Sequence, residues 1–84
     1  MVKVNWEKEA INFLKKLDKQ DAKRIVKKVG MISENVERHL QGLVNIKEDK
    51  IRIGDYRLFV EYDYQKKELF IFTIKHRKNA YKND

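Results

Sequence analysis

Apolar positions follow two different periods along this chain, and the change occurs near Leu43. At the N-terminal end Val2, Val4 and Trp6 alternate with polar residues, which predicts a short strand. We expect Asn5 to cap a following helix, because an Asn side chain accepts hydrogen bonds from the free amides of a first turn and acidic residues follow it.

Two helical stripes come next. Apolar side chains recur at helical spacing, first at Trp6, Ala10, Phe13, Leu14 and Leu17 and then at Ala22, Ile25, Val29, Ile32 and Val36. Asp18 or Asp21 is expected to cap the second helix. The short connection between the stripes predicts a helical hairpin, and each apolar stripe needs a surface to cover.

From Leu43 onward the period is two. Residues 43–53, 56–62 and 68–75 are rich in Ile, Val, Phe and Tyr, which predicts three strands. Gly54-Asp55 predicts a short hairpin turn, and residues 63–67 a longer polar one. The expected order is β-α-α-β-β-β, an α+β domain over residues 1–84 with both helices on one sheet face.

A two-residue turn at Gly54-Asp55 fixes which residues face each other. One face would hold the core residues Ile51, Ile53, Tyr56, Leu58 and Val60, and the opposite face Lys50, Arg52, Arg57 and Phe59. Arg52 would lie directly opposite Arg57, which is destabilising unless an anion lies between them. Cations and a ring on a helix-free sheet face favour binding of a phosphate backbone and a base, although cations are also common on ordinary solvent-facing strands.

Composition restricts the partners and the chemistry. Twenty Lys and Arg against thirteen Asp and Glu give a net charge of +7, which predicts an acidic partner such as nucleic acid, an anionic membrane surface or an acidic protein. The lack of Cys excludes disulfides and thiol catalysis, and the two histidines lack ligand spacing, so no metal is expected. Without an apolar run of membrane-spanning length or a signal-peptide core, a cytoplasmic location is expected.

A second basic cluster ends the chain. It comprises Lys75, His76, Arg77, Lys78 and Lys82, with Tyr81 among them. Such a segment is usually only solvated, although interleaved Tyr and His residues favour nucleic acid through stacking and proton transfer. Strand alternation places His76 on the side of three apolar residues, Phe70, Phe72 and Ile74. This favours a structural role for His76 over catalysis.

Residues 51–58 (IRIGDYRL), followed by residues 76–81 (HRKNAY), resemble the RelE/ParE toxin superfamily, and more closely its RelE-like branch. The helical half is also similar, at residues 14–17 (LKKL) and 24–28 (RIVKK), so the resemblance spans nearly the whole chain. It implies a four-stranded antiparallel sheet with an N-terminal helical hairpin packed on one face.

For RelE-like members the resemblance implies a messenger-RNA endonuclease that acts on the translating ribosome without metal or cofactor. The RNA 2′-hydroxyl attacks its own phosphate and leaves a 2′,3′-cyclic phosphate. The catalytic residues carried over by position are Lys50, Arg57, Arg77 and Tyr81. A second family lysine falls on Glu48, a departure for which Arg52 or Lys47 are candidate substitutes. Further RNA contacts are expected from Lys47, Arg52, Phe59, Lys75, Lys78 and Lys82.

The resemblance also implies partners. A toxin of a type II toxin–antitoxin system is silenced by a cognate RelB-like antitoxin that wraps it in a hetero-oligomer, while messenger RNA and the ribosome are its targets and no membrane is involved. Two alternatives stay open from the sequence. One is a ParE-like inhibitor of DNA gyrase without RNA chemistry, and the other is a non-catalytic nucleic-acid-binding module or a decayed toxin.

Overall fold

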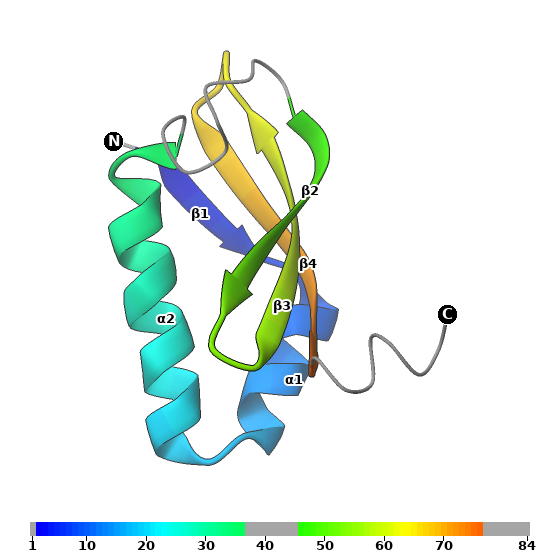
Figure 1. Ribbon diagram of the computed structural model, residues 1–84. Coiled ribbons are helices and arrows are strands. Elements are labelled where there is room, and N and C mark those ends of the chain that lie inside the picture. The colour runs from blue at the N-terminus through cyan, green and yellow to red at the C-terminus, as the bar shows by residue number, and fades with distance from the viewer. Residues whose placement is uncertain (1, 37–45, 77–84) are drawn as a thin grey trace.

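The computed structural model describes residues 2–36 and 46–76, with side chains from Lys50 onward in the second of these segments. Its elements are β1 (Lys3–Trp6), α1 (Lys8–Lys16), α2 (Lys19–Ser33), β2 (Ile46–Ile53), β3 (Tyr56–Asp63) and β4 (Glu68–His76). The predicted α+β class and β-α-α-β-β-β order are confirmed. In Figure 1, α2 runs along one side of the sheet and α1 packs behind β4.

The four strands form one sheet in the order β1-β4-β3-β2. The pairs β2–β3 and β3–β4 are antiparallel, as expected, whereas β1 pairs with β4 in parallel. Parallel neighbours need a long crossover connection, and the helical hairpin together with the β2–β3 hairpin supplies it. The sheet is therefore antiparallel except for this edge pair.

The start of α1 differs from the expected cap at Asn5. The N-cap is Glu7, which makes no side-chain cap hydrogen bond. Asn5 lies in β1, and its Nδ2 donates to Glu68 Oε1 at 3.1 Å. The backbone N–H of Glu7 donates to the Ile71 carbonyl at 2.9 Å. Pairing with β4 thus holds the chain extended past Asn5, and the helix begins only afterwards.

The second helix begins as predicted. Asp18 is its N-cap, and the Asp18 Oδ1 accepts a hydrogen bond from the backbone N–H of Gln20 at 2.8 Å. The expected apolar stripe is confirmed, because Ile25, Val29, Ile32 and Val36 are buried. The rest of the core comes from Ala10 of α1 and from the strand residues Ile51, Ile53, Leu58, Val60, Tyr62, Leu69, Ile71 and Ile74.

The β2–β3 hairpin has the predicted register. Ile53 pairs with Tyr56, and the ladder continues through Arg52–Arg57, Ile51–Leu58 and Lys50–Phe59. Gly54 has a φ of +58°, whereas Asp55 keeps a negative φ. A two-residue turn in which only the first central residue has a positive φ is of type II′. The twist of such a turn matches the twist of the two flanking strands.

A β-bulge at Phe72 corrects the expected alternation of β4. Phe59 pairs with Thr73 and Val60 with Ile71, so Phe72 is an extra residue on β4. The core-facing residues change from Leu69 and Ile71 before the bulge to Ile74 after it. The expectation that His76 shares a side with Phe70 and Phe72 is therefore wrong, because the bulge shifts the alternation by one residue. His76 does share a side with Ile74.

Candidate nucleic-acid interface

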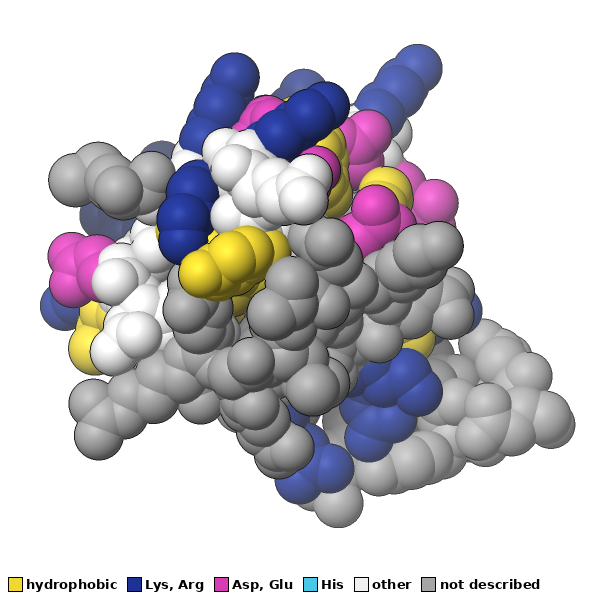
Figure 2. Space-filling view, turned by 90° about the horizontal axis from the view of Figure 1, so that it is seen from above, with side chains coloured by type: hydrophobic (Ala, Val, Ile, Leu, Met, Phe, Trp, Pro, Cys, Tyr) yellow, Lys and Arg dark blue, Asp and Glu magenta, His cyan; other side chains and the backbone are white. Residues whose placement is uncertain are grey.

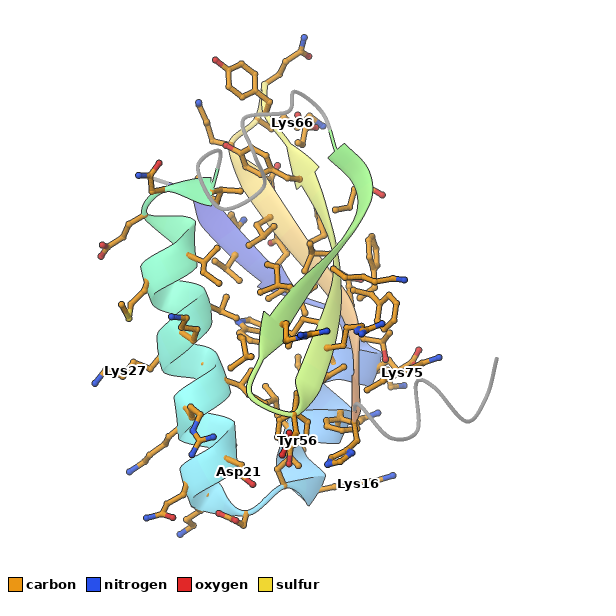
Figure 3. All side chains as sticks on the ribbon, in the orientation of Figure 1. Lys16, Asp21, Lys27, Tyr56, Lys66 and Lys75 are labelled. Atoms are coloured by element: carbon orange, nitrogen blue, oxygen red, sulfur yellow. The ribbon has the colours of Figure 1, made fainter. Side chains whose placement is uncertain are left out.

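The helix-free side of the sheet carries a row of three cations close to the β2–β3 turn. Arg52 on β2 pairs with Arg57 on β3, and Arg57 pairs with Lys75 on β4. Neighbouring strands lie about 4.8 Å apart, so the row crosses three strands within roughly 10 Å. Lys75 projects to the side of the molecule opposite Lys27 of α2 (Figure 3). We call Lys50, Arg52, Arg57, Phe59 and Lys75 the cationic face.

Phe59 is the centre of the cationic face. The Nζ of Lys50 lies 5.5 Å from the centroid of its ring, and the Nζ of Lys75 lies 5.6 Å from the same centroid. Both distances fall within the range of cation–π attraction. The ring therefore holds ammonium groups from β2 and β4 close to Arg57. These contacts place two ammonium groups around one half-buried aromatic ring.

Repulsion within the row of cations favours an anionic ligand. Like charges directly opposite on a ladder are destabilising, and an anion between them reverses the sign of that term. Lys50, Arg52 and Lys75 are exposed, while Arg57 is half-buried. Arginine presents planar, permanently charged donors that match phosphate oxygens. The arrangement is thus suited to bind a phosphate-containing polymer.

Toward the β3–β4 turn the same side of the sheet also carries carboxylates, and Lys3 of β1 pairs with one of them, Glu68. By strand alternation Glu61 and Asp63 share this side with Arg57 and Phe59, and Asp63 pairs with Glu68. Figure 2, viewed from this end of the molecule, shows acidic side chains gathered on one part of the described surface. A polyanion is consequently directed to the end of the sheet that carries the β2–β3 turn.

An aromatic cluster on the helix side braces the strands that carry Arg57 and Lys75. The Tyr56 hydroxyl donates to Asp21 Oδ2 of α2 at 3.3 Å (Figure 3). The Tyr56 ring makes edge contacts with Phe13 of α1 at 6.0 Å and with His76 of β4 at 5.3 Å between centroids. Burial of Tyr56, followed by the nearby Asp21 carboxylate, raises the pKa of its hydroxyl.

This cluster gives His76 a packing role, in keeping with its structural interpretation. The sequence indicated that Tyr56 faces the core but gave no sign of its hydrogen bond to Asp21. Those two residues lie 35 positions apart. Only the packing of α2 against the end of the sheet brings them together.

The structure brings together five of the residues that the sequence proposed, namely Lys50, Arg52, Arg57, Phe59 and Lys75. Arg77, Lys78, Tyr81 and Lys82 lie outside the described residues, as does the side chain of Lys47 in β2. Within residues 2–36 and 46–76, no group of three His, Cys, Asp or Glu side chains is placed to hold a metal ion. In that same part of the chain, no helix has the length and apolar character to cross a membrane.

Comparison with protein families gives a match over nearly the whole chain. The model described as "ParE toxin of type II toxin-antitoxin system, parDE" matches residues 4–81. A search of curated protein sequences gives no match.

Solved structures with a similar fold include RelE toxins. The RelE–RelB complex of the archaeon Pyrococcus horikoshii is 18% identical with a TM-score of 0.70, covering 90% of this chain and 94% of that one. The isolated Escherichia coli RelE toxin is 17% identical with a TM-score of 0.71, covering 99% and 98%. The intact E. coli RelBE complex is 20% identical with a TM-score of 0.67, covering 90% and 96%. At these identities the similarity establishes the fold.

Proposed function

This chain belongs to the ParE toxin family of type II toxin–antitoxin systems, within the RelE/ParE superfamily, and we propose that it is a ribosome-dependent messenger-RNA endonuclease. The observation that supports this choice is the cationic face, where Arg57 lies between Arg52 and Lys75 beside a ring flanked by two ammonium groups. A phosphate backbone with its bases is a polymer that suits both the charges and the ring.

The proposed reaction is an internal transesterification. The 2′-hydroxyl oxygen bonds to the adjacent phosphorus and loses its proton, while the bond to the 5′-oxygen breaks and that oxygen gains a proton. Arg57 and Arg77 would donate to the non-bridging oxygens as negative charge builds on them. Lys50 would take part in proton transfer, and Tyr81 would stack on a base or relay a proton. The ribosome would supply the alignment of the reacting groups.

Primer extension on a defined messenger in a purified translation system tests this proposal. The protein is added to reactions with and without ribosomes, and new 3′ ends are mapped. Cleavage at the codon being decoded, and only in the presence of ribosomes, is expected. In the same assay Arg77→Ala should lose cleavage, and a fully active Arg77→Ala protein would contradict the role given to Arg77. An intact messenger beside growth arrest in cells would refute the endonuclease.

Inhibition of DNA gyrase is the second candidate function, and the family match favours it, because the matching model describes a ParE toxin. A gyrase inhibitor has no chemical need to keep Lys50, Arg57, Arg77 and Tyr81 together. Supercoiling of relaxed plasmid by purified gyrase separates the two candidates. Inhibition by this protein at concentrations that leave the messenger intact would move the assignment to gyrase.

We also propose a cognate RelB-like antitoxin as the partner, in a cytoplasmic hetero-oligomer. Similar structures from P. horikoshii and E. coli were determined as complexes with RelB, and the net charge of +7 suits an acidic binding segment. Co-expression with each small protein encoded beside it, followed by size-exclusion chromatography and a growth assay, tests this. The cognate antitoxin should co-elute with the toxin and restore growth.

A further inference from the structure

A pair of stacked phenylalanine rings adjoins the cationic face. Phe70 and Phe72 have ring centroids 6.4 Å apart and an interplanar angle of 16°. Phe72 is 41% exposed, which is high for a large apolar side chain in a small fold. Ile71 between them is fully buried in the core, so Phe70 lies on the side of the sheet opposite the helices, and the stacked contact places the Phe72 ring beside it.

The bulge gives Phe72 its position. As the extra residue of β4, Phe72 has no ladder partner on β3, while its neighbour Thr73 pairs with Phe59. Thr73 shares the side of its partner Phe59, and its Oγ1 donates to Glu9 Oε1 of α1 at 2.9 Å. Phe72 therefore stands between Phe70 and the residue opposite Phe59. Diagonal neighbours on a ladder lie about 7–8 Å apart. The Phe72 ring is therefore close enough to Phe59 for one nucleotide to contact both the ring pair and the cationic face.

The charges around the ring pair favour binding of a nucleobase over binding of a phosphate group. Glu61 lies directly opposite Phe70 on β3, and Glu68 precedes Phe70 by two residues on the same side of β4. Glu68 faces Lys3 of β1 and accepts a hydrogen bond from Asn5 Nδ2, so Glu61 is the carboxylate that repels a phosphate group here. A nucleobase is uncharged, has a flat apolar face for the rings and carries N–H donors that a carboxylate accepts.

We propose that Phe70 and Phe72 form a base-stacking subsite, on which a nucleobase next to the phosphate held by Arg57 is stacked. The inference rests on the proposed function, since the strand that reaches this subsite is the RNA bound at the cationic face. Stacking on an aromatic face tolerates any base, so the subsite strengthens binding and fixes the position of the strand without selecting a sequence.

Binding of short fluorescent single-stranded RNA, with 2′-O-methyl groups to prevent cleavage, tests the subsite in the full chain. Phe72→Leu keeps an apolar side chain but removes the aromatic face, whereas Phe72→Trp keeps an aromatic face. We expect Phe72→Leu to weaken binding about tenfold and Phe72→Trp to bind within about twofold of wild type. Met31→Leu on α2 changes an exposed apolar residue far from this face and should bind as wild type does. Circular dichroism confirms that each variant is folded.

A second set of RNAs identifies the contact as stacking. An abasic nucleotide is moved through the RNA one position at a time. At one position, the loss caused by Phe72→Leu should disappear, because there is no base left to stack. Equal binding by wild type and Phe72→Leu for the intact RNA would overturn the subsite.

The two proposals fail in different ways. If Arg57→Ala loses RNA affinity and ribosome-dependent cleavage while Phe72→Leu retains both, the subsite is wrong and the proposed function stands. If the wild-type protein binds no RNA and inhibits gyrase, both are wrong. A wild-type protein that cleaves on the ribosome and loses affinity on Phe72→Leu supports both.

Discussion

Arg52 and Arg57 face each other across the β2–β3 ladder, and Lys75 continues the row on β4. Like charges directly opposite each other on a ladder repel, and a bound anion lessens this repulsion. We expect Arg52→Gln to raise the free energy of unfolding by up to about 1 kcal/mol at low ionic strength. The gain should shrink as salt screens the charges. Urea unfolding at low and high salt measures it, and Lys27→Gln on α2 is the matched control. An equal gain in the control would exclude repulsion within the row as the cause.

Lys75 is expected to contribute to RNA binding through its charge. For single-stranded nucleic acid, the slope of log affinity against log salt falls by about 0.7 for each phosphate contact removed. Lys75→Ala should therefore reduce the slope by about that amount, whereas Lys27→Ala should leave it unchanged. Fluorescence anisotropy over a salt series with non-cleavable RNA gives both slopes. Identical slopes for Lys75→Ala and the wild type would remove Lys75 from the interface.

Tyr56→Phe removes the hydrogen bond to Asp21 but keeps the ring. We expect a loss of about 1 kcal/mol in the free energy of unfolding near neutral pH. The folded state raises the pKa of Tyr56 above 10.0, so the unfolded chain releases this proton first as the pH rises. The advantage of the wild type over Tyr56→Phe should thus be complete below pH 10 and decline above it. Chemical denaturation of both proteins along a pH series tests this, and a difference that grows above pH 10 would contradict it.

Two glycines should respond oppositely to alanine. Gly54 has a φ of +58°, and an added Cβ would lie 3.4 Å from Arg24 Nη1. Gly54→Ala should therefore destabilise the protein by about 1 kcal/mol or more. Gly30 lies in α2, and an added Cβ would meet no atom within 4 Å beyond its chain neighbours and the nearby backbone of its own helix. Gly30→Ala should stabilise the protein by about 0.5–1 kcal/mol, because alanine is the better helix former. Thermal melts of the two variants measure both, and changes of the same sign would contradict this assignment.

Local signals predicted the β2–β3 hairpin and the start of α2. Gly54-Asp55 between alternating strands fixes the turn, and the turn fixes that Arg52 pairs with Arg57. Asp18 caps α2 through a hydrogen bond to a residue only two positions away. Such features need no knowledge of the rest of the fold, so the sequence is sufficient for them.

Long-range contacts account for what the sequence missed. Asn5 resembles a helix cap, but pairing with a strand 63 residues further along places its side chain on Glu68 instead. The bulge at Phe72 was hidden because Phe70 and Phe72 are as apolar as the residues that enter the core. The only trace is the spacing of Leu69, Ile71 and Ile74, whose three-residue step between the last two breaks the period of two.

The most direct test of the endonuclease is primer extension in a purified translation system with the wild type, Arg57→Ala and Lys27→Ala. Arg57→Ala removes the central cation of the row, and loss of one donor to the developing phosphate charge typically lowers the rate by about 100-fold or more. Lys27→Ala removes a cation from the opposite side of the molecule (Figure 3). We predict ribosome-dependent cleavage by the wild type and Lys27→Ala, and its loss in a folded Arg57→Ala protein. Equal cleavage by all three proteins, or an intact messenger with the wild type, would contradict a catalytic cationic face.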